Sequence, residues 1–181
     1  MPELPEVETI RRQLRGEIIG QMVLRAGSHQ SEKFLPARKT KGRRFIELAR
    51  RGKYLIGEFD DETELIIHLG MTGQLLVDRE AEFAKNHDQY CRAWWSLTDG
   101  KTVVFRDVRR FGRIAVVGKG DYSKIPTLRD MGPEPFSVGL TGNDVWHRTR
   151  GRRSRIKTQL LSQRLIAGVG NIYADEALFL A

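Results

Sequence analysis

The spacing of the apolar residues changes twice along this 181-residue chain. From Pro5 to about Leu14 they recur at helical spacing, and Gly16 and Gly20 mark the end of the predicted helix. Short β-type runs bounded by glycine, aspartate or charged turns follow, at residues 22–24, 44–48, 54–59, 64–68, 94–105 and 113–117. In the run at 94–105, Asp99-Gly100 predicts a hairpin with a type I′ turn, which requires positive φ at both residues. Residues 1–125 are therefore predicted to form a helix followed by a β-sandwich domain.

Prolines at 126, 133 and 135 interrupt regular structure, so residues 126–142 are predicted to be a linker. Beyond it the pattern is helical at 144–149, 154–166 and 172–180, with a break at 168–170 and Asn171 as N-cap of the last helix. The predicted class is α+β, with an all-helical domain at 143–181. The last helix reaches Ala181 without a cap and with its apolar face unpaired, so we expect a C-terminally truncated fragment.

The charge indicates a polyanionic partner. The chain has 31 Lys and Arg against 23 Asp and Glu, a net charge of +8, which favours nucleic acid over an anionic membrane. A basic protein with an ordinary solvated surface remains the alternative on charge alone. Cys91 is the only cysteine, which excludes an intramolecular disulfide and fits a reducing, cytosolic compartment. The sequence shows no charged-then-apolar leader and no apolar run near ~18 residues, which argues against secretion and against membrane spanning.

The first three residues carry a candidate nucleophile. Removal of Met1 would leave Pro2 as a secondary amine. An α-amino group has a pKa of about 8 against about 10.4 for lysine, so more of it is neutral near pH 7. Attack on a sugar C1′ would give an iminium ion that acts as an electron sink. The alternative is an ordinary start to a helix.

Four further stretches place basic or polar residues beside glycines, where a phosphate can approach closely: residues 50–54, 68–73, 107–112 and 163–176. Each has a structural alternative on its own. The arginines could form solvated charge runs or surface ion pairs, His68 an edge histidine and Met71 a core filler. The glycine-rich turn could simply join two helices.

In this order, the motifs resemble bacterial formamidopyrimidine-DNA glycosylases, base-excision enzymes that remove oxidised purines. The resemblance covers the whole chain and is carried by residues 1–8, 51–53, 68–71, 85–88, 109–112, 132–135 and 168–176. An endonuclease VIII-like enzyme for oxidised pyrimidines fits less well, since that branch typically begins Met-Pro-Glu-Gly and this chain has Leu4.

The resemblance implies a bifunctional glycosylase and abasic-site lyase. Pro2 would attack C1′ and form the Schiff base, Glu3 would assist sugar opening and proton transfer, and Lys53 would assist the lyase step. The target nucleotide must be flipped out of the duplex, and a wedge of Met71, Arg109 and Phe111 would fill the gap. The other DNA-binding residues that it implies are His68, His87, Arg110, Arg152, Lys157 and Asn171, with residues 168–170 as the turn of a helix-two-turn-helix.

Family members continue into a four-cysteine zinc finger, whose ligands this chain lacks. One cysteine and four scattered histidines do not make a structural zinc site. No cofactor is therefore expected in this chain. The expected partner is double-stranded DNA containing oxidised purines, bound by a monomer in the cytoplasm at the nucleoid. A non-enzymatic DNA-binding remnant is the rival hypothesis.

Overall fold

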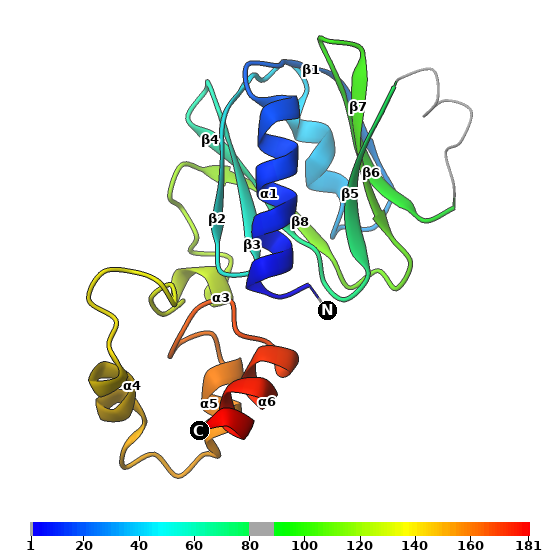
Figure 1. Cartoon of the computed structure of the whole chain (residues 1–181). Coiled ribbons are helices and arrows are strands. Elements are labelled where there is room, and N and C mark those ends of the chain that lie inside the picture. Colours follow the sequence, from blue (N-terminus) through cyan, green and yellow to red (C-terminus); the bar gives the residue numbers. More distant parts are fainter. Residues whose placement is uncertain (1, 80–88) are drawn as a thin grey trace.

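The computed structural model describes residues 2–79 and 89–181. A 15-residue helix, α1 (Leu4–Ile18), is followed by two four-stranded antiparallel sheets and then by a group of helices (Figure 1). The predicted α+β class, with an N-terminal helix, a β-sandwich and a helical part, is confirmed. In the described part of the chain, no helix has the length and apolar character needed to cross a membrane.

The two sheets enclose one apolar core. The first has the order β1 (Val23–Ser28), β6 (Cys91–Leu97), β7 (Lys101–Asp107), β5 (Gly73–Arg79). The second has the order β2 (Phe45–Arg51), β3 (Tyr54–Phe59), β4 (Thr63–His68), β8 (Arg113–Gly118). Large side chains from both sheets are fully buried between them, among them Trp95, Phe105, Leu55 and Phe59. Burial of this apolar area is the main force that holds the sandwich together.

Helix α1 lies along the open side of the sandwich, between β2 and β5 (Figure 1). Its residues Val7, Leu14 and Ile18 are buried against the core, one stripe of an amphipathic helix. The helix runs past the predicted end at Leu14 because Gly16 is tolerated inside it. The consequence for the site is that the chain's first residues lie at the lower end of the sandwich, beside the C-terminal helices (Figure 1).

Three local predictions in the sandwich need correction. Strand β5 and the 3₁₀ helix η1 (Leu35–Thr40) were not predicted. β5 is an edge strand with several exposed residues, so its apolar signal is diluted. The hairpin of β6 and β7 is present, but its turn is not type I′: among its described residues only Gly100 has positive φ, +80°. Asp99 instead accepts a hydrogen bond from the Lys101 backbone N–H (3.1 Å).

The C-terminal helices are α3 (Pro126–Arg129), α4 (Gly142–Thr149), α5 (Ile156–Leu161) and α6 (Asn171–Leu180). Helix α3 lies inside the predicted linker. The predicted long helix at 154–166 is wrong, because the chain leaves helical geometry after Leu161 and Gln163 has φ +62°. Asn171 is not the N-cap of α6 either; Gly170 is, and it supplies no side-chain cap. The predicted domain boundaries at residues 125 and 142 stay predictions.

Candidate functional site

The carboxylate of Glu3 lies at the N-terminus of α6, 167 or more residues away in sequence. It accepts hydrogen bonds from the backbone N–H groups of Gly170 (2.7 Å), Ile172 (2.9 Å) and Tyr173 (3.3 Å). These are among the N–H groups that a helix leaves without an internal partner, and the helix dipole favours an anion there. Glu3 thus takes the capping role that the sequence had assigned to Asn171.

Two glycines allow this close approach. A Cβ added to Gly170 would lie 2.3 Å from the Glu3 carboxyl carbon, and one added to Gly168 would lie 2.6 Å from the Leu4 side chain. The Leu4 N–H also donates to the Gly168 carbonyl (3.1 Å). The predicted turn at 168–170 is therefore the surface against which the N-terminus packs. Pro2, half-buried, is placed at this junction by its neighbours.

Lys53 is the second residue of the tight turn between β2 and β3 and is only 6% exposed. Burial lowers the pKa of its amine, and the Glu3 carboxylate opposes that shift. A buried amine with a lowered pKa is a better proton acceptor near neutral pH than an exposed lysine. Lys53 lines a pocket of about 350 Å³ together with Tyr54, His68, Phe111, Arg113, Thr127, Leu161 and Gln163.

His68 lies in the same pocket as a neutral ring. Burial, and then the charges of Lys53 and Arg113, lower its pKa to about 4. Its Nδ1 accepts a hydrogen bond from the Gly70 N–H (3.2 Å), which leaves the proton on Nε2. His68 can therefore donate one hydrogen bond to a phosphate or sugar oxygen, but it adds no positive charge at neutral pH.

The three predicted wedge residues project from two adjoining loops. Met71 and Phe111 are 42% and 47% exposed, and the Arg109 guanidinium stacks over the Phe111 ring at 4.8 Å. Arg110, between them, is exposed and has φ +57°. The structure thus brings Met71, Arg109 and Phe111 together on one surface, while their predicted roles stay predictions.

Asp107 holds these two loops together, a role that was not predicted from the sequence. It is fully buried, and its carboxylate accepts hydrogen bonds from the Thr72 hydroxyl (2.6 Å) and the Gly112 N–H (2.8 Å). Gly70 completes the contact with φ +66°, since an added Cβ would lie 2.5 Å from the Phe111 carbonyl carbon. The sequence did contain a signal for this role: an aspartate ends an apolar strand shortly before Arg-Arg-Phe-Gly.

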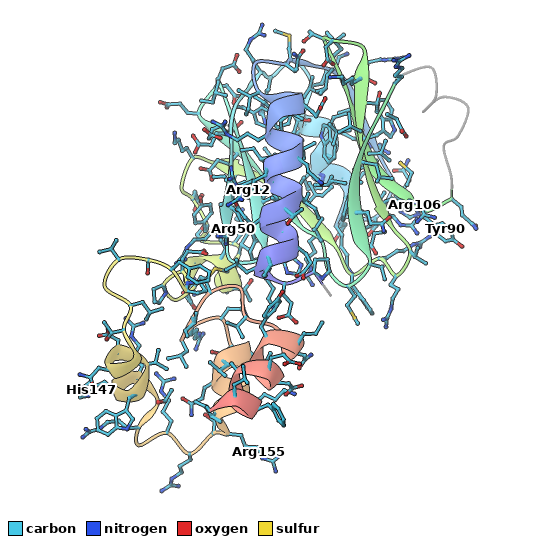
Figure 2. All side chains as sticks on the ribbon, in the orientation of Figure 1. Arg12, Arg50, Tyr90, Arg106, His147 and Arg155 are labelled. Atoms are coloured by element: carbon cyan, nitrogen blue, oxygen red, sulfur yellow. The ribbon has the colours of Figure 1, made fainter. Side chains whose placement is uncertain are left out.

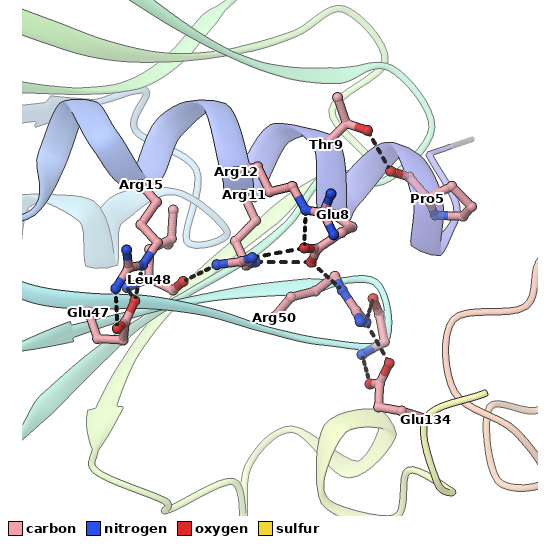
Figure 3. Close-up of polar contacts among 11 residues, drawn as sticks. Pro5, Glu8, Thr9, Arg11, Arg12, Arg15, Glu47, Leu48, Arg50 and Glu134 are labelled. Carbon is pink, nitrogen blue, oxygen red and sulfur yellow. Dashed lines mark hydrogen bonds and ion pairs between the residues drawn. The ribbon is translucent and has the colours of Figure 1, made fainter. Parts of the chain in front are cut away.

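Arg50 and Arg51 are engaged in structural ion pairs, so a role for them as free phosphate ligands is not supported. Arg50 bridges Glu8 (3.1 Å) and Glu134 (2.7 Å), and Arg51 also pairs with Glu134 (3.2 Å). Glu134 accepts a further hydrogen bond from the Gly52 N–H (2.7 Å). Figure 3 shows the contacts of Arg50 with Glu8 and Glu134, which tie α1, the end of β2 and the chain before α4 into one network. Glu134 was missed because its partners are more than 80 residues away.

The predicted phosphate-binding residues are spread over the helical part. Asn171 is exposed at the first turn of α6, and Lys157 pairs with Asp175 (2.6 Å). Arg152 lies on the exposed segment before α5. His87 lies outside the described residues. The Gln163 side chain braces the turn by accepting from the Gly168 N–H (2.9 Å) and donating to the Val169 carbonyl (2.7 Å).

The described residues do not fit a zinc site. Over residues 2–79 and 89–181, no three His, Cys, Asp or Glu side chains come close enough to hold a metal ion. Cys91 is a single thiol, whereas a structural zinc needs four ligands. No chemical step in this part of the chain is therefore assigned to a metal.

Comparison with known families matches nearly the whole chain. Residues 1–114 match the formamidopyrimidine-DNA glycosylase N-terminal domain, and residues 131–181 match the H2TH domain of the same family. A formamidopyrimidine-DNA glycosylase of Thermomicrobium roseum is 43% identical over 100% of this chain and 68% of its own length. One from Thermus thermophilus is 42% identical, with 64% of its length covered. The chain thus spans about two thirds of these relatives.

Solved structures agree with this result. The MutM (Fpg) protein of Thermus thermophilus superposes with a TM-score of 0.87 at 42% identity, over 98% of this chain and 64% of that one. The Lactococcus lactis formamidopyrimidine-DNA glycosylase bound to DNA containing an abasic site superposes with a TM-score of 0.87 at 32% identity, over 98% and 69%.

Proposed function

This chain belongs to the formamidopyrimidine-DNA glycosylase family, and on that premise we propose that it excises oxidised purines from double-stranded DNA and cleaves the resulting abasic site. The observation that carries the proposal is that two groups, the Glu3 carboxylate and the Lys53 amine, lie near each other where the N-terminus meets the C-terminal helices. The Glu3 carboxylate is fixed beside the N-terminus, and the buried Lys53 amine interacts with it electrostatically. Base excision at the bacterial chromosome would place the protein in the cytoplasm. We also propose that it acts as a monomer.

The proposed reaction uses the amine of Pro2 once Met1 has been removed. Its nitrogen forms a bond to C1′ as the bond from C1′ to the damaged base breaks, and the proton released from the nitrogen balances the one that the departing base takes up. Opening of the sugar ring transfers a proton to its ring oxygen, the step in which Glu3 would assist, and leaves an iminium ion at C1′. Loss of a C2′ proton then expels the 3′ phosphate. Lys53, with its lowered pKa, is suited to the proton transfers of this step.

The surface around this junction supports DNA as the substrate. Met71, Arg109 and Phe111 form an exposed edge of one apolar rod, one guanidinium and one ring, the kind of wedge that can replace a flipped nucleotide. The abasic-site DNA bound by the Lactococcus lactis relative is consistent with the same class of substrate for this chain. Lesion choice between oxidised purines and pyrimidines is a separate outcome of the test below.

Borohydride trapping tests the proposal. The protein is incubated with a duplex carrying one 8-oxoguanine opposite cytosine, and we expect a reduced covalent adduct that Pro2→Gly does not form. Lys39→Ala, an exposed lysine on η1, is the matched control and should trap as wild type does. Binding to the duplex without any adduct would identify a non-enzymatic DNA-binding chain. An adduct only with an oxidised pyrimidine would identify an endonuclease VIII-like specificity.

A further inference from the structure

A cluster of arginines lies at the end of α4 and on the segment leading to α5. Residues 147–155 read His-Arg-Thr-Arg-Gly-Arg-Arg-Ser-Arg, with no acidic residue among them. Arg148, Arg150, Arg152, Arg153 and Arg155 are all exposed. We call residues 147–155 the arginine segment. Only Arg152 was expected from the sequence to bind DNA, so the other four arginines have no role in the function proposed above.

In the described part of the chain, the five guanidinium groups of the arginine segment make no direct ion pair with a carboxylate. Elsewhere, many arginines are held by carboxylates, including Arg11, Arg12, Arg15, Arg43, Arg50, Arg51, Arg129 and Arg164. Asp144, the acidic residue nearest in sequence, accepts hydrogen bonds from Thr141 in the capping box of α4, and these bonds, followed by the charges of Arg148 and His147, lower the pKa of its carboxyl. One carboxylate therefore faces five arginines. A net positive potential therefore remains over this surface.

The backbone of the arginine segment is held in place. The Arg150 N–H donates to the Trp146 carbonyl (2.9 Å) and the Arg152 N–H to the Thr149 carbonyl (3.2 Å). The buried Gln159 side chain donates to the Ser154 carbonyl (2.8 Å), which anchors the segment to α5. The Arg150 guanidinium stacks on the Trp146 ring at 4.6 Å. Binding a ligand therefore costs this segment less conformational entropy than it would cost a free basic tail.

The position of the segment indicates what it meets. His147 and Arg155, labelled in Figure 2, lie at the end of the helical part that is farthest from the sandwich. The segment leads directly into α5, where Lys157 is expected to bind a phosphate. The N-terminal end of α1, which carries Glu3 as its N-cap, lies at the opposite end, toward the sandwich (Figure 1). A duplex held at Lys157 and Asn171 would have to extend beyond them to reach the arginine segment.

We propose that the arginine segment binds the phosphate backbone of the same duplex, outside the region contacted at the lesion, and so extends the DNA footprint. Guanidinium groups match phosphate oxygens in charge and in bidentate geometry. Trp146 and Ile156, which flank the segment, are 54% and 41% exposed, so the preference for DNA over an anionic membrane comes from the proposed function and from the match of guanidinium to phosphate, and vesicle binding is an arm of the test. This inference rests on the proposed function for the identity of the polyanion.

The salt dependence of binding to an undamaged duplex tests the inference. Each phosphate contact adds about 0.9 to the slope of log K against log salt concentration. The triple variant Arg148→Ala/Arg153→Ala/Arg155→Ala should therefore lower the slope by about 2.7 and weaken binding most at low salt. It leaves Arg152 and the Arg150–Trp146 stack intact. The matched control is Lys39→Ala/Lys41→Ala/Lys124→Ala, which removes the same charge from exposed positions elsewhere and should leave the slope unchanged.

Three results would overturn the inference: a wild-type slope for the arginine variant, an equal fall in both triple variants, or lost binding to phosphatidylserine vesicles with duplex binding unchanged. Thermal unfolding of the variant checks that it folds, and the double variant Arg148→Ala/Arg155→Ala should lower the slope by about 1.8 if the triple variant does not fold. Wild-type borohydride trapping, run in parallel, separates the two proposals. A lower slope in the variant with no wild-type adduct would refute the enzyme and support the arginine segment.

Discussion

Replacing Glu134 by alanine should destabilise the fold through a single carboxylate. That carboxylate accepts hydrogen bonds from the Gly52 N–H, from Arg50 and from Arg51. The side chains of Glu134 and Arg50 are 25% and 14% exposed, so truncation leaves a largely buried guanidinium without one of its two carboxylate partners. Hydrogen bonds to charged groups contribute about 1.5–3 kcal/mol each. With partial solvent access to the remaining groups, we expect the free energy of unfolding to fall by about 3 kcal/mol.

Urea unfolding at pH 7 measures this loss, and two variants sharpen it. Glu134→Gln keeps an acceptor for the Gly52 N–H but removes the charge that Arg50 and Arg51 meet, so its loss should be smaller than that of alanine. Arg129→Ala breaks an exposed ion pair with its neighbour Asp130 and should cost nothing measurable. A loss for Glu134→Ala no larger than that for Arg129→Ala would refute the reasoning.

The pH dependence of the difference in unfolding free energy between wild type and Glu134→Gln is a second check. Burial opposes ionisation of Glu134, but the hydrogen bonds from the Gly52 N–H and from Arg50 outweigh it, so the pKa of the Glu134 carboxyl is lowered in the folded protein. The unfolded chain then binds this proton more readily than the folded one. The stabilisation is therefore complete above the unfolded pKa of about 4.3 and is lost as the pH falls through the lower folded value. The gap between wild type and Glu134→Gln should narrow below about pH 4; an equal gap at pH 3 and pH 7 would contradict this cause.

Three further predictions concern the pocket and the wedge. Gly70→Ala should lower the free energy of unfolding by well over the ~1 kcal/mol expected for positive φ alone, because the added Cβ would meet the Phe111 backbone. Gly100→Ala is the control, since an added Cβ there has open space and should cost only the backbone strain. Equal losses for the two variants in chemical denaturation would contradict this. Asp107→Asn should cost about 1–3 kcal/mol, since an amide can accept only one of the two hydrogen bonds that the carboxylate accepts, and unchanged thermal stability would count against it. His68 should titrate in NMR with a pKa of about 4. Because its pKa in the unfolded chain is about 6.5, the free energy of unfolding should fall as the pH drops from about 6.5 toward 4. Titration near 6.5 would show that the ring is not desolvated.

The sequence predicted the parts of the fold that depend on local pattern. The strands β2, β3, β4 and β8 alternate or form short apolar runs, and their predicted positions agree with the structure within a few residues. Strand β5 was missed because an exposed edge strand carries a weak apolar signal. The long helix at 154–166 was predicted from an apolar stripe that continues to Leu165. Leu165 is indeed buried, but from a turn rather than from a helix.

The site divides in the same way. Pro2, Glu3 and Lys53 were predicted as site residues through motifs, and the structure shows that the Glu3 carboxylate acts electrostatically on the Lys53 amine. What holds these two residues in place was not predictable, because the partners of Glu3 at Gly170 and of Gly52 at Glu134 are 167 and 82 residues away. No local spacing rule reports such a contact. The capping of α6 was therefore assigned to the nearest suitable side chain, Asn171, instead of to the third residue of the chain.

The contact between Glu3 and α6 also sets an order on the folding of this protein. Its two ends are separated by nearly the whole chain, so closing it carries a large loop entropy that earlier local contacts must first reduce. During synthesis the first residues emerge long before residues 170–173 exist, and until then the Glu3 carboxylate has none of these three N–H groups to meet. The N-terminal end of the chain is made first, but the Glu3 carboxylate is positioned only after residues 170–173 have been made.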